Sequence, residues 1–139
     1  MGYYTVFKAV FDRVKADVEA KTNIKQVVLG GPPVIRELPL AIINPDVTSF
    51  SQVAFGSTLE NRLVFEVILI IRETEPADWF TEIITVMGDV MDAILADRSL
   101  SGTVTDTTPM IFAPGEVRMA NNIYFGGLLR FECLFFYSP

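Results

Sequence analysis

The fold is decided by the stretch Ile94-Leu95-Ala96-Asp97-Arg98-Ser99-Leu100-Ser101-Gly102-Thr103-Val104-Thr105-Asp106. An apolar-striped helix is predicted to end in its first half, and a Thr- and Val-rich strand over residues 102–108 is predicted to begin in its second half. The predicted strands on either side of this helix, residues 62–73 and 123–137, carry apolar side chains on both faces. Since two helices cannot cover both faces of a sheet, we expect other copies of the chain to supply the missing cover.

Two amphipathic helices are predicted from the spacing of apolar residues. Phe7, Val10, Phe11, Val14 and Val18 fall on one stripe and predict a helix over residues 3–21. A second helix is predicted to start at Glu75-Pro76, because proline at the first helical position needs no N–H and acidic residues favour the positive end of the helix dipole. Its apolar stripe comprises Phe80, Ile83, Ile84, Met87, Val90, Met91, Ile94 and Leu95, and its wet side comprises Asp78, Glu82, Thr85, Asp89 and Asp92.

The remaining segments predict extended structure. Residues 24–29 and 38–43 are two short strands, residues 47–60 are a strand or a long loop, and residues 110–122, with Ala113-Pro114-Gly115, are a turn-bearing connection at the tip of a hairpin. Gly126-Gly127 indicates a bulge or a place where another backbone comes close. The sequence therefore predicts a single α+β domain over residues 1–139, with two helices packed on a largely antiparallel sheet of four to five strands.

Composition narrows the classes of function. Hydrophobic residues make up 50% of the chain and charged residues 20%, below the typical value of about 25%, so part of the exterior is expected to be buried in the working state. The net charge of −6, without any basic run, argues against a protein that grips nucleic acid. The N-terminus does not resemble a signal peptide and no long apolar run occurs, so we expect a soluble, intracellular protein with no membrane partner.

We expect no catalytic residue, no cofactor and no metal. Histidine is absent, which removes Ser-His-Asp and Cys-His catalysis and a common metal ligand. Gly30-Gly31-Pro32-Pro33 indicates a turn rather than a phosphate loop, because prolines lack the amide donors that such a loop needs. The single Cys133 is interpreted as a small core residue, and Trp79 with Phe80 as helix-to-core packing rather than a nucleic-acid platform. The helix carboxylates Glu82, Asp89 and Asp92 are interpreted as a solvated face.

Charged residues interrupt the otherwise apolar strands at Glu66, Arg72, Arg130 and Glu132. They either pair across neighbouring strands or pair across a subunit boundary. The alternative to a subunit boundary is that the loops at 44–61 and 109–121 fold over the second face of the sheet, so that the chain covers itself. As candidates for a subunit interface we select Phe50, Phe55, Glu66, Arg72, Met110, Phe112, Met119, Tyr124, Arg130 and Glu132.

The order of these elements resembles that of the tail terminator (tail completion) proteins of long-tailed bacteriophages and related viruses. The resemblance is carried by the junction at residues 93–104, by the preceding long strand and by the final aromatic strand ending in Phe135-Phe136-Tyr137. Proteins of that family also begin with a helix, end their second helix in a similar acidic, leucine and glycine pattern, and close with a strand. The resemblance spans most of the chain.

The resemblance implies a structural virion protein of the tail or neck, assembled in the host cytoplasm. It implies a hexameric ring that caps the tail tube, stops its polymerisation and contacts head-completion or connector proteins. DNA would pass through without specific binding, since acidic walls repel phosphates. Two other functions stay open: a ferredoxin-like ligand-binding or regulatory domain that dimerises, and another ring of the neck, such as a head-completion or connector protein.

Overall fold

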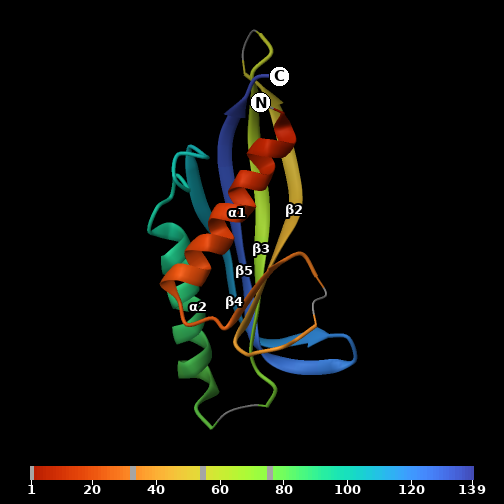
Figure 1. Cartoon of the computed structure of the whole chain (residues 1–139), viewed down its shortest axis with the longest axis vertical. Coiled ribbons are helices and arrows are strands. Elements are labelled where there is room, and N and C mark those ends of the chain that lie inside the picture. Colours follow the sequence, from red (N-terminus) through yellow and green to blue (C-terminus); the bar gives the residue numbers. More distant parts are fainter. Residues whose placement is uncertain (1, 32–33, 54–55, 75–76) are drawn as a thin grey trace.

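The computed structural model describes residues 2–31, 34–53, 56–74 and 77–139. They form two helices and a five-stranded sheet in the order α1 (Tyr3–Lys21), β1 (Gln26–Leu29), β2 (Leu40–Gln52), β3 (Leu59–Arg72), α2 (Trp79–Leu95), β4 (Asp106–Met119) and β5 (Asn122–Tyr137). The strands lie in the order β1-β2-β3-β5-β4; β1 and β2 are parallel, and the other three pairings are antiparallel. Both helices lie on one side of a long, narrow sheet (Figure 1). The predicted α+β class is confirmed.

The main core lies between the helices and the two central strands. Alternate residues of β3 and β5 face the helices, and the rings of Phe65 and Phe131 stack with centroids 5.2 Å apart. Phe11 of α1 meets Phe65 edge-on at 6.0 Å. Full burial of each large apolar side chain contributes roughly 1.5–3 kcal/mol, so this layer supplies much of the stability of the fold.

Both predicted helices are present. The helix α1 has the predicted bounds and buries Val10, Phe11, Val14 and Val18. The helix α2 buries most of its predicted stripe, but Phe80 is 56% exposed, and Trp79 packs against the core beside it. The prediction that Phe80 lies on the buried stripe is therefore wrong. Glu75 and Pro76, the predicted start of α2, lie outside the described residues.

The strand β2 is longer than its sequence predicts. It continues through Asn44-Pro45-Asp46, which we expected to end it, and a register shift between Pro45 and Thr48 accommodates the irregularity. β1 pairs with residues 40–43 of β2, so Pro45 lies where β2 has become an edge of the sheet. Proline has no backbone N–H to donate, but at an edge of the sheet no neighbouring strand needs that hydrogen bond. Residues 47–60 therefore hold the second half of β2, a turn and the start of β3.

The strand β4 begins later than predicted, at Asp106 rather than near Gly102. The carboxylate of Asp97 accepts hydrogen bonds from the backbone N–H and hydroxyl of Ser99, at 3.1 and 2.7 Å, and from the N–H of Ser101 at 2.8 Å. Leu100 and Ser101 have φ of 48° and 62°. An aspartate that satisfies the following backbone donors favours a turn over a strand.

The far end of β4 also differs from the prediction. Ala113-Pro114-Gly115 is part of the strand, which runs on to Met119, so the prediction of a non-strand connection with its turn there is wrong, whereas the predicted long hairpin with its tip within residues 110–122 is confirmed. The reversal falls at residues 120–121. Because β4 is the last strand of the sheet, Pro109 and Pro114 remove no hydrogen bond that another strand requires.

The second face of the sheet is covered at one end by the chain itself. A small cluster of Leu40, Ile42 and Ile70 is buried there. Ile35 and Leu38 pack against it from one side, and the end of the β4–β5 hairpin packs against it through Val117, Met119 and Tyr124. Figure 1 shows this hairpin end bending away from the long axis of the sheet. The expectation that other copies must cover the whole second face is therefore wrong at this end.

Two glycines allow this bend because neighbouring backbones come close to them. A Cβ on Gly126 would lie 1.8 Å from the carbonyl oxygen of Leu69, and one on Gly127 would lie 2.6 Å from that of Ala113. The register of β3 against β5 also shifts between Ile70 and Arg72. The predicted close approach of another backbone at Gly126-Gly127 is confirmed, whereas the bulge lies on the partner strand, where Ile71 is the extra residue.

We predict that Gly126→Ala lowers the free energy of unfolding by about 3 kcal/mol or more, because strand backbone would have to move. Gly88→Ala is the matched control. It lies within α2, and a Cβ added there meets nothing within 4 Å, so it should stabilise by about 0.5–1 kcal/mol. Urea unfolding of both variants checks this; equal stabilities would contradict the close approach.

Candidate assembly surface

Beyond the small cluster, the second face of the sheet carries ion pairs. Here Arg130 on β5 lies 3.3 Å from Asp46 and 3.4 Å from Glu66. Arg62 on β3 lies 2.9 Å from Glu132 and 3.6 Å from Glu60. The side chains are partly exposed, so each pair contributes less than about 1 kcal/mol. We call this surface the open face, defined by Asp46, Glu60, Arg62, Val64, Glu66, Leu128, Arg130, Glu132, Leu134 and Phe136.

Pairing between neighbouring strands accounts for three of the four charges that interrupt the strands. Glu66, Arg130 and Glu132 each face an opposite charge on a neighbouring strand. The half-buried Val64 lies between the two groups of ion pairs. Leu134 lies opposite Arg62, Leu128 lies in the row beyond Arg130, and Phe136 is half exposed. This mixture of apolar and paired charged side chains resembles the surface of a protein interface rather than a sealed core.

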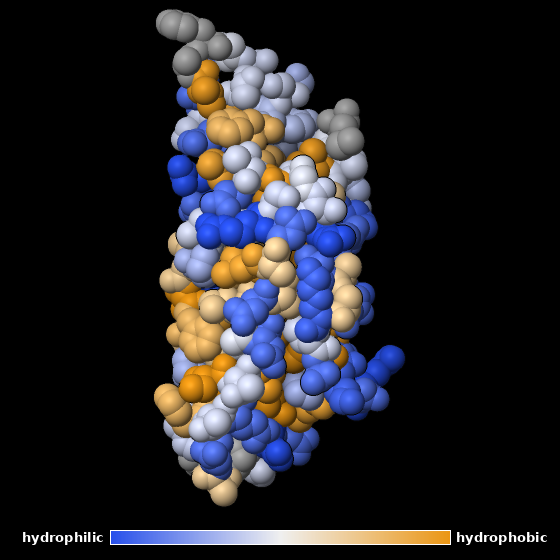
Figure 2. Space-filling view, turned by 90° about the vertical axis from the view of Figure 1, so that its left-hand side faces the viewer, coloured by the Kyte–Doolittle hydropathy of each residue, from blue (hydrophilic) through white to orange (hydrophobic). Residues whose placement is uncertain are grey.

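Exposed apolar side chains also follow the outer strand. Met110 is 51% and Phe112 is 41% exposed on β4. The register of β4 shifts between Pro109 and Ile111, so Met110 has no partner residue on β5. Seen from the side of α2, hydrophobic patches alternate with a hydrophilic band rather than forming one apolar face (Figure 2).

The structure separates the other interface candidates. Phe50, half exposed on β2, has its ring 5.7 Å from that of Tyr3. Met119 and Tyr124 are partly buried against the chain's own small cluster. Phe55 lies outside the described residues. Phe50, Met110 and Phe112 are therefore the apolar candidates left most accessible, and the whole set stays a prediction as a subunit interface.

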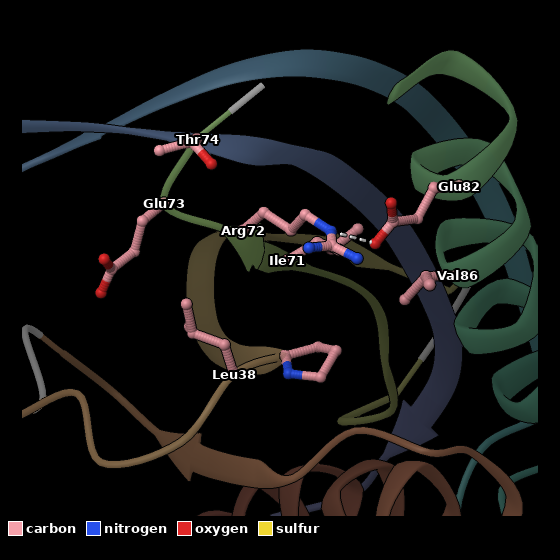
Figure 3. Close-up of a pocket in the computed structure, with 8 residues that line it drawn as sticks. Leu38, Ile71, Arg72, Glu73, Thr74, Glu82 and Val86 are labelled. Carbon is pink, nitrogen blue, oxygen red and sulfur yellow. Dashed lines mark hydrogen bonds and ion pairs between the residues drawn. The ribbon is translucent and has the colours of Figure 1, made fainter. Parts of the chain in front are cut away.

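Arg72 has a different environment from the other candidate charges. Its guanidinium reaches from the end of β3 to Glu82 on α2, at 2.5 Å, along the wall of an open cavity of about 440 Å³ (Figure 3). Leu38 lies across the cavity, and Glu73 points away from the pair (Figure 3). Sequence reasoning placed Glu82 on the wet side of its helix, but it could not show that the end of β3 lies beside it.

The net charge of the chain resides in one region. Residues 73–97 contain seven acidic residues and no basic residue, so the rest of the chain sums to +1, since −6 minus −7 is +1. Asp89 and Asp92 are exposed, and neither has an ion pair within the described parts of the chain. The last turn of α2 has no basic residue to complement its dipole. In contrast, the wet side of α1 carries paired charges, such as Lys8 with Asp12.

The sequence patterns considered above did not identify one buried carboxylate, that of Asp17. Asp17 of α1 is almost fully buried and lies 3.1 Å from Arg13 and 3.6 Å from Lys21. Its position, three residues after Val14 and seven after Val10, places it on the apolar stripe, which is a signal that the sequence does contain. A buried carboxylate with two cations on its own helix is a structural feature of α1.

The described residues show no cluster of side chains that could hold a metal ion. Within residues 2–31, 34–53, 56–74 and 77–139, no group of three or more His, Cys, Asp or Glu could hold a metal ion. No helix of this part of the chain is both long and apolar enough to cross a membrane. Cys133 is buried in the core with its Sγ 3.6 Å from the hydroxyl of Thr107. Burial raises the pKa of this thiol to about 11, which outweighs the lowering effect of that hydrogen bond.

In fold, the chain is similar to a solved structure described as the sheath/tube terminator, in the extended state, of the extracellular contractile injection system PVC. The match has a TM-score of 0.60 and 13% sequence identity, and it covers 94% of this chain and 56% of that chain. This chain thus spans little more than half the length of its structural neighbour. No protein-family model and no curated protein matches the sequence. The terminator-like fold implied by the sequence resemblance is confirmed.

We predict that Cys133 makes stability depend on pH above its ordinary pKa of 9.0. Since the folded thiol ionises near pH 11, its contribution is complete below pH 9 and is lost between pH 9 and 11, by up to about 3 kcal/mol. Urea unfolding of the wild type and Cys133→Ala across this range measures the effect. The stability difference between them should shrink as the pH rises, and a constant difference would contradict the prediction.

Proposed function

We propose that the protein is a structural, non-enzymatic terminator that assembles into a ring on the end of a tail tube and stops its polymerisation. The observation that carries this proposal is the likeness in fold, over 94% of the chain, to a protein described as a sheath/tube terminator. The open face and the exposed side chains of β4 add support, because they offer surface for neighbouring copies and partner proteins.

The proposed ring contains six copies joined head to tail. The two edges of the sheet are different. One edge is β4, with Met110 and Phe112, and the other is β1 with the exposed half of β2, which includes Phe50. Two different patches that complement each other make a heterologous contact, which closes into a ring when its rotation permits.

The proposed partners are the tail tube protein on one side of the ring and a head-completion or connector protein on the other. The proposed location is the tail or neck of a virus or of a similar particle, with assembly in the host cytoplasm. DNA in such a particle passes through the ring without specific binding. The unpaired acids of residues 73–97 favour this, because negative walls repel phosphates.

The ferredoxin-like alternative fits the structure less well. That fold has the element order βαββαβ, whereas this chain has the order αβββαββ. A dimerising regulatory domain therefore has no specific feature of the structure in its favour. A second kind of neck ring differs from a terminator in its partners rather than in its fold, so binding experiments separate the two.

We predict that the purified chain forms particles with six times the mass of one copy, either in solution or on tube ends. Mass photometry gives the mass, and electron microscopy of the tube protein polymerised with and without the chain shows its effect. Shorter tubes capped at one end are expected. A ring that binds a connector but leaves tube length unchanged would indicate another neck ring, and a fixed dimer that a small ligand stabilises would indicate a regulator.

We predict that Met110→Lys combined with Phe112→Lys prevents ring formation while the monomer stays folded. Both side chains are exposed, so charges there cost little in the monomer, but a desolvated contact would bury them. The matched control is Phe80→Lys, an equally exposed aromatic on α2. The double variant should raise the concentration for half assembly by about a hundredfold. Rings that survive it would remove β4 from the interface.

A further inference from the structure

We infer that neighbouring copies make contact when residues 34–36 of one copy insert into a groove of the next, which lies between β3, β5 and β4 where the open face meets the small cluster. The inference rests on the proposed ring and names the surfaces that close it. It depends on three features: a protruding segment held by hydrogen bonds to Gln26, an apolar groove, and two opposite charges without an ion pair among the described residues.

The protruding segment presents a valine to solvent from a fixed backbone. Val34 is 77% exposed. The side-chain amide of Gln26 donates to the carbonyl of Val34 at 3.0 Å, and its oxygen accepts from the N–H groups of Arg36 and Glu37 at 2.9 and 3.3 Å. Ile35 packs inward on the small cluster. Because the segment is already ordered, its insertion into a partner costs little conformational entropy.

The groove lies where the β4–β5 hairpin bends over the sheet. It encloses about 370 Å³ and is lined mainly by apolar surface, with Glu66 and Glu116 at its margin. Glu66 is already paired with Arg130 of its own chain. The apolar lining of the groove suits an aliphatic side chain, which gains by leaving water. Its apolar lining residues are Ile68, Ala113, Pro114, Val117 and Leu128.

The charges beside the segment and the groove are complementary. Arg36 and Glu116 are both exposed, and within the described ranges neither side chain has an ion pair. When Val34 lies in the groove, the guanidinium of Arg36, two residues later in the chain, is brought toward the margin that carries Glu116. An opposite charge at the rim steers association and fixes the register of the contact.

The two surfaces lie at the same level of the sheet but in different strands. Gln26, which holds the segment, is in the row of Leu40, Ile70 and Gly126. The groove includes the adjacent row of Ile68, Leu128 and Ala113. Sites in neighbouring rows allow copies to be related by rotation about an axis parallel to the strands with little rise, as a closed ring requires.

A charge exchange between Arg36 and Glu116 tests the contact in the full-length protein. We expect Arg36→Glu and Glu116→Arg each to raise the concentration for half assembly of the ring about tenfold, and the two together to restore it to within about threefold of the wild type. Lys25→Glu is the matched control. Lys25 is another exposed cation without an ion pair in the described residues, directly before β1, and its reversal should not be rescued by Glu116→Arg.

Val34→Asp tests the apolar part of the contact, with Phe80→Asp as the matched control, because Phe80 is an exposed apolar residue on α2, outside both proposed ring edges. Loss of the ring with Val34→Asp, but not with Phe80→Asp, supports the inference. Rings that form normally with Val34→Asp, or a charge exchange without rescue, overturn this contact and leave the proposed function intact. A wild-type chain that neither forms rings nor binds tube ends removes the proposed function and this contact together.

Discussion

The stacking of Phe65 on Phe131 joins the two central strands under the helices, and the remaining structure depends on this layer. Phe11 adds the N-terminal helix to the same contact, and the alternate residues of β3 and β5 extend it along the sheet. Both helices pack on this face. The other face is covered at one end by the bent end of the hairpin and by residues 35 and 38, and over the rest it carries ion pairs. The surface offered to partners is a direct result of how few layers the chain possesses.

Elements with a regular apolar pattern could be predicted from the sequence. The stripe of Val10, Phe11, Val14 and Val18 fixed the bounds of α1, and continuous apolar runs identified β3 and β5. Two of the errors fall at Pro45 and Pro114, where we expected proline to interrupt a strand. Whether proline is tolerated depends on whether the strand has a neighbour on that side, and the order of strands in a sheet is not a local property of the sequence.

The candidate surface was predictable in composition but not in arrangement. Glu66, Arg130 and Glu132 were recognised as unusual in apolar strands, yet the choice between pairing within the chain and pairing with a neighbour required the register of β3 against β5. Met119 and Tyr124 were selected as interface candidates, whereas they pack against the chain's own small cluster. No short sequence pattern indicates that the hairpin bends toward Leu40. The two glycines that permit this bend were the available signal.

The prolines at the sheet edges have a consequence for assembly. Pro45 and Pro109 lie in the same row, each beside a shift in register, on edges at opposite sides of the sheet. Such interruptions deny a foreign backbone a continuous template, so copies are prevented from extending one another's sheets without limit. Association is left to side chains, whose geometry can specify a finite number of neighbours. A protein proposed to halt the growth of a polymer is thus itself guarded against becoming one.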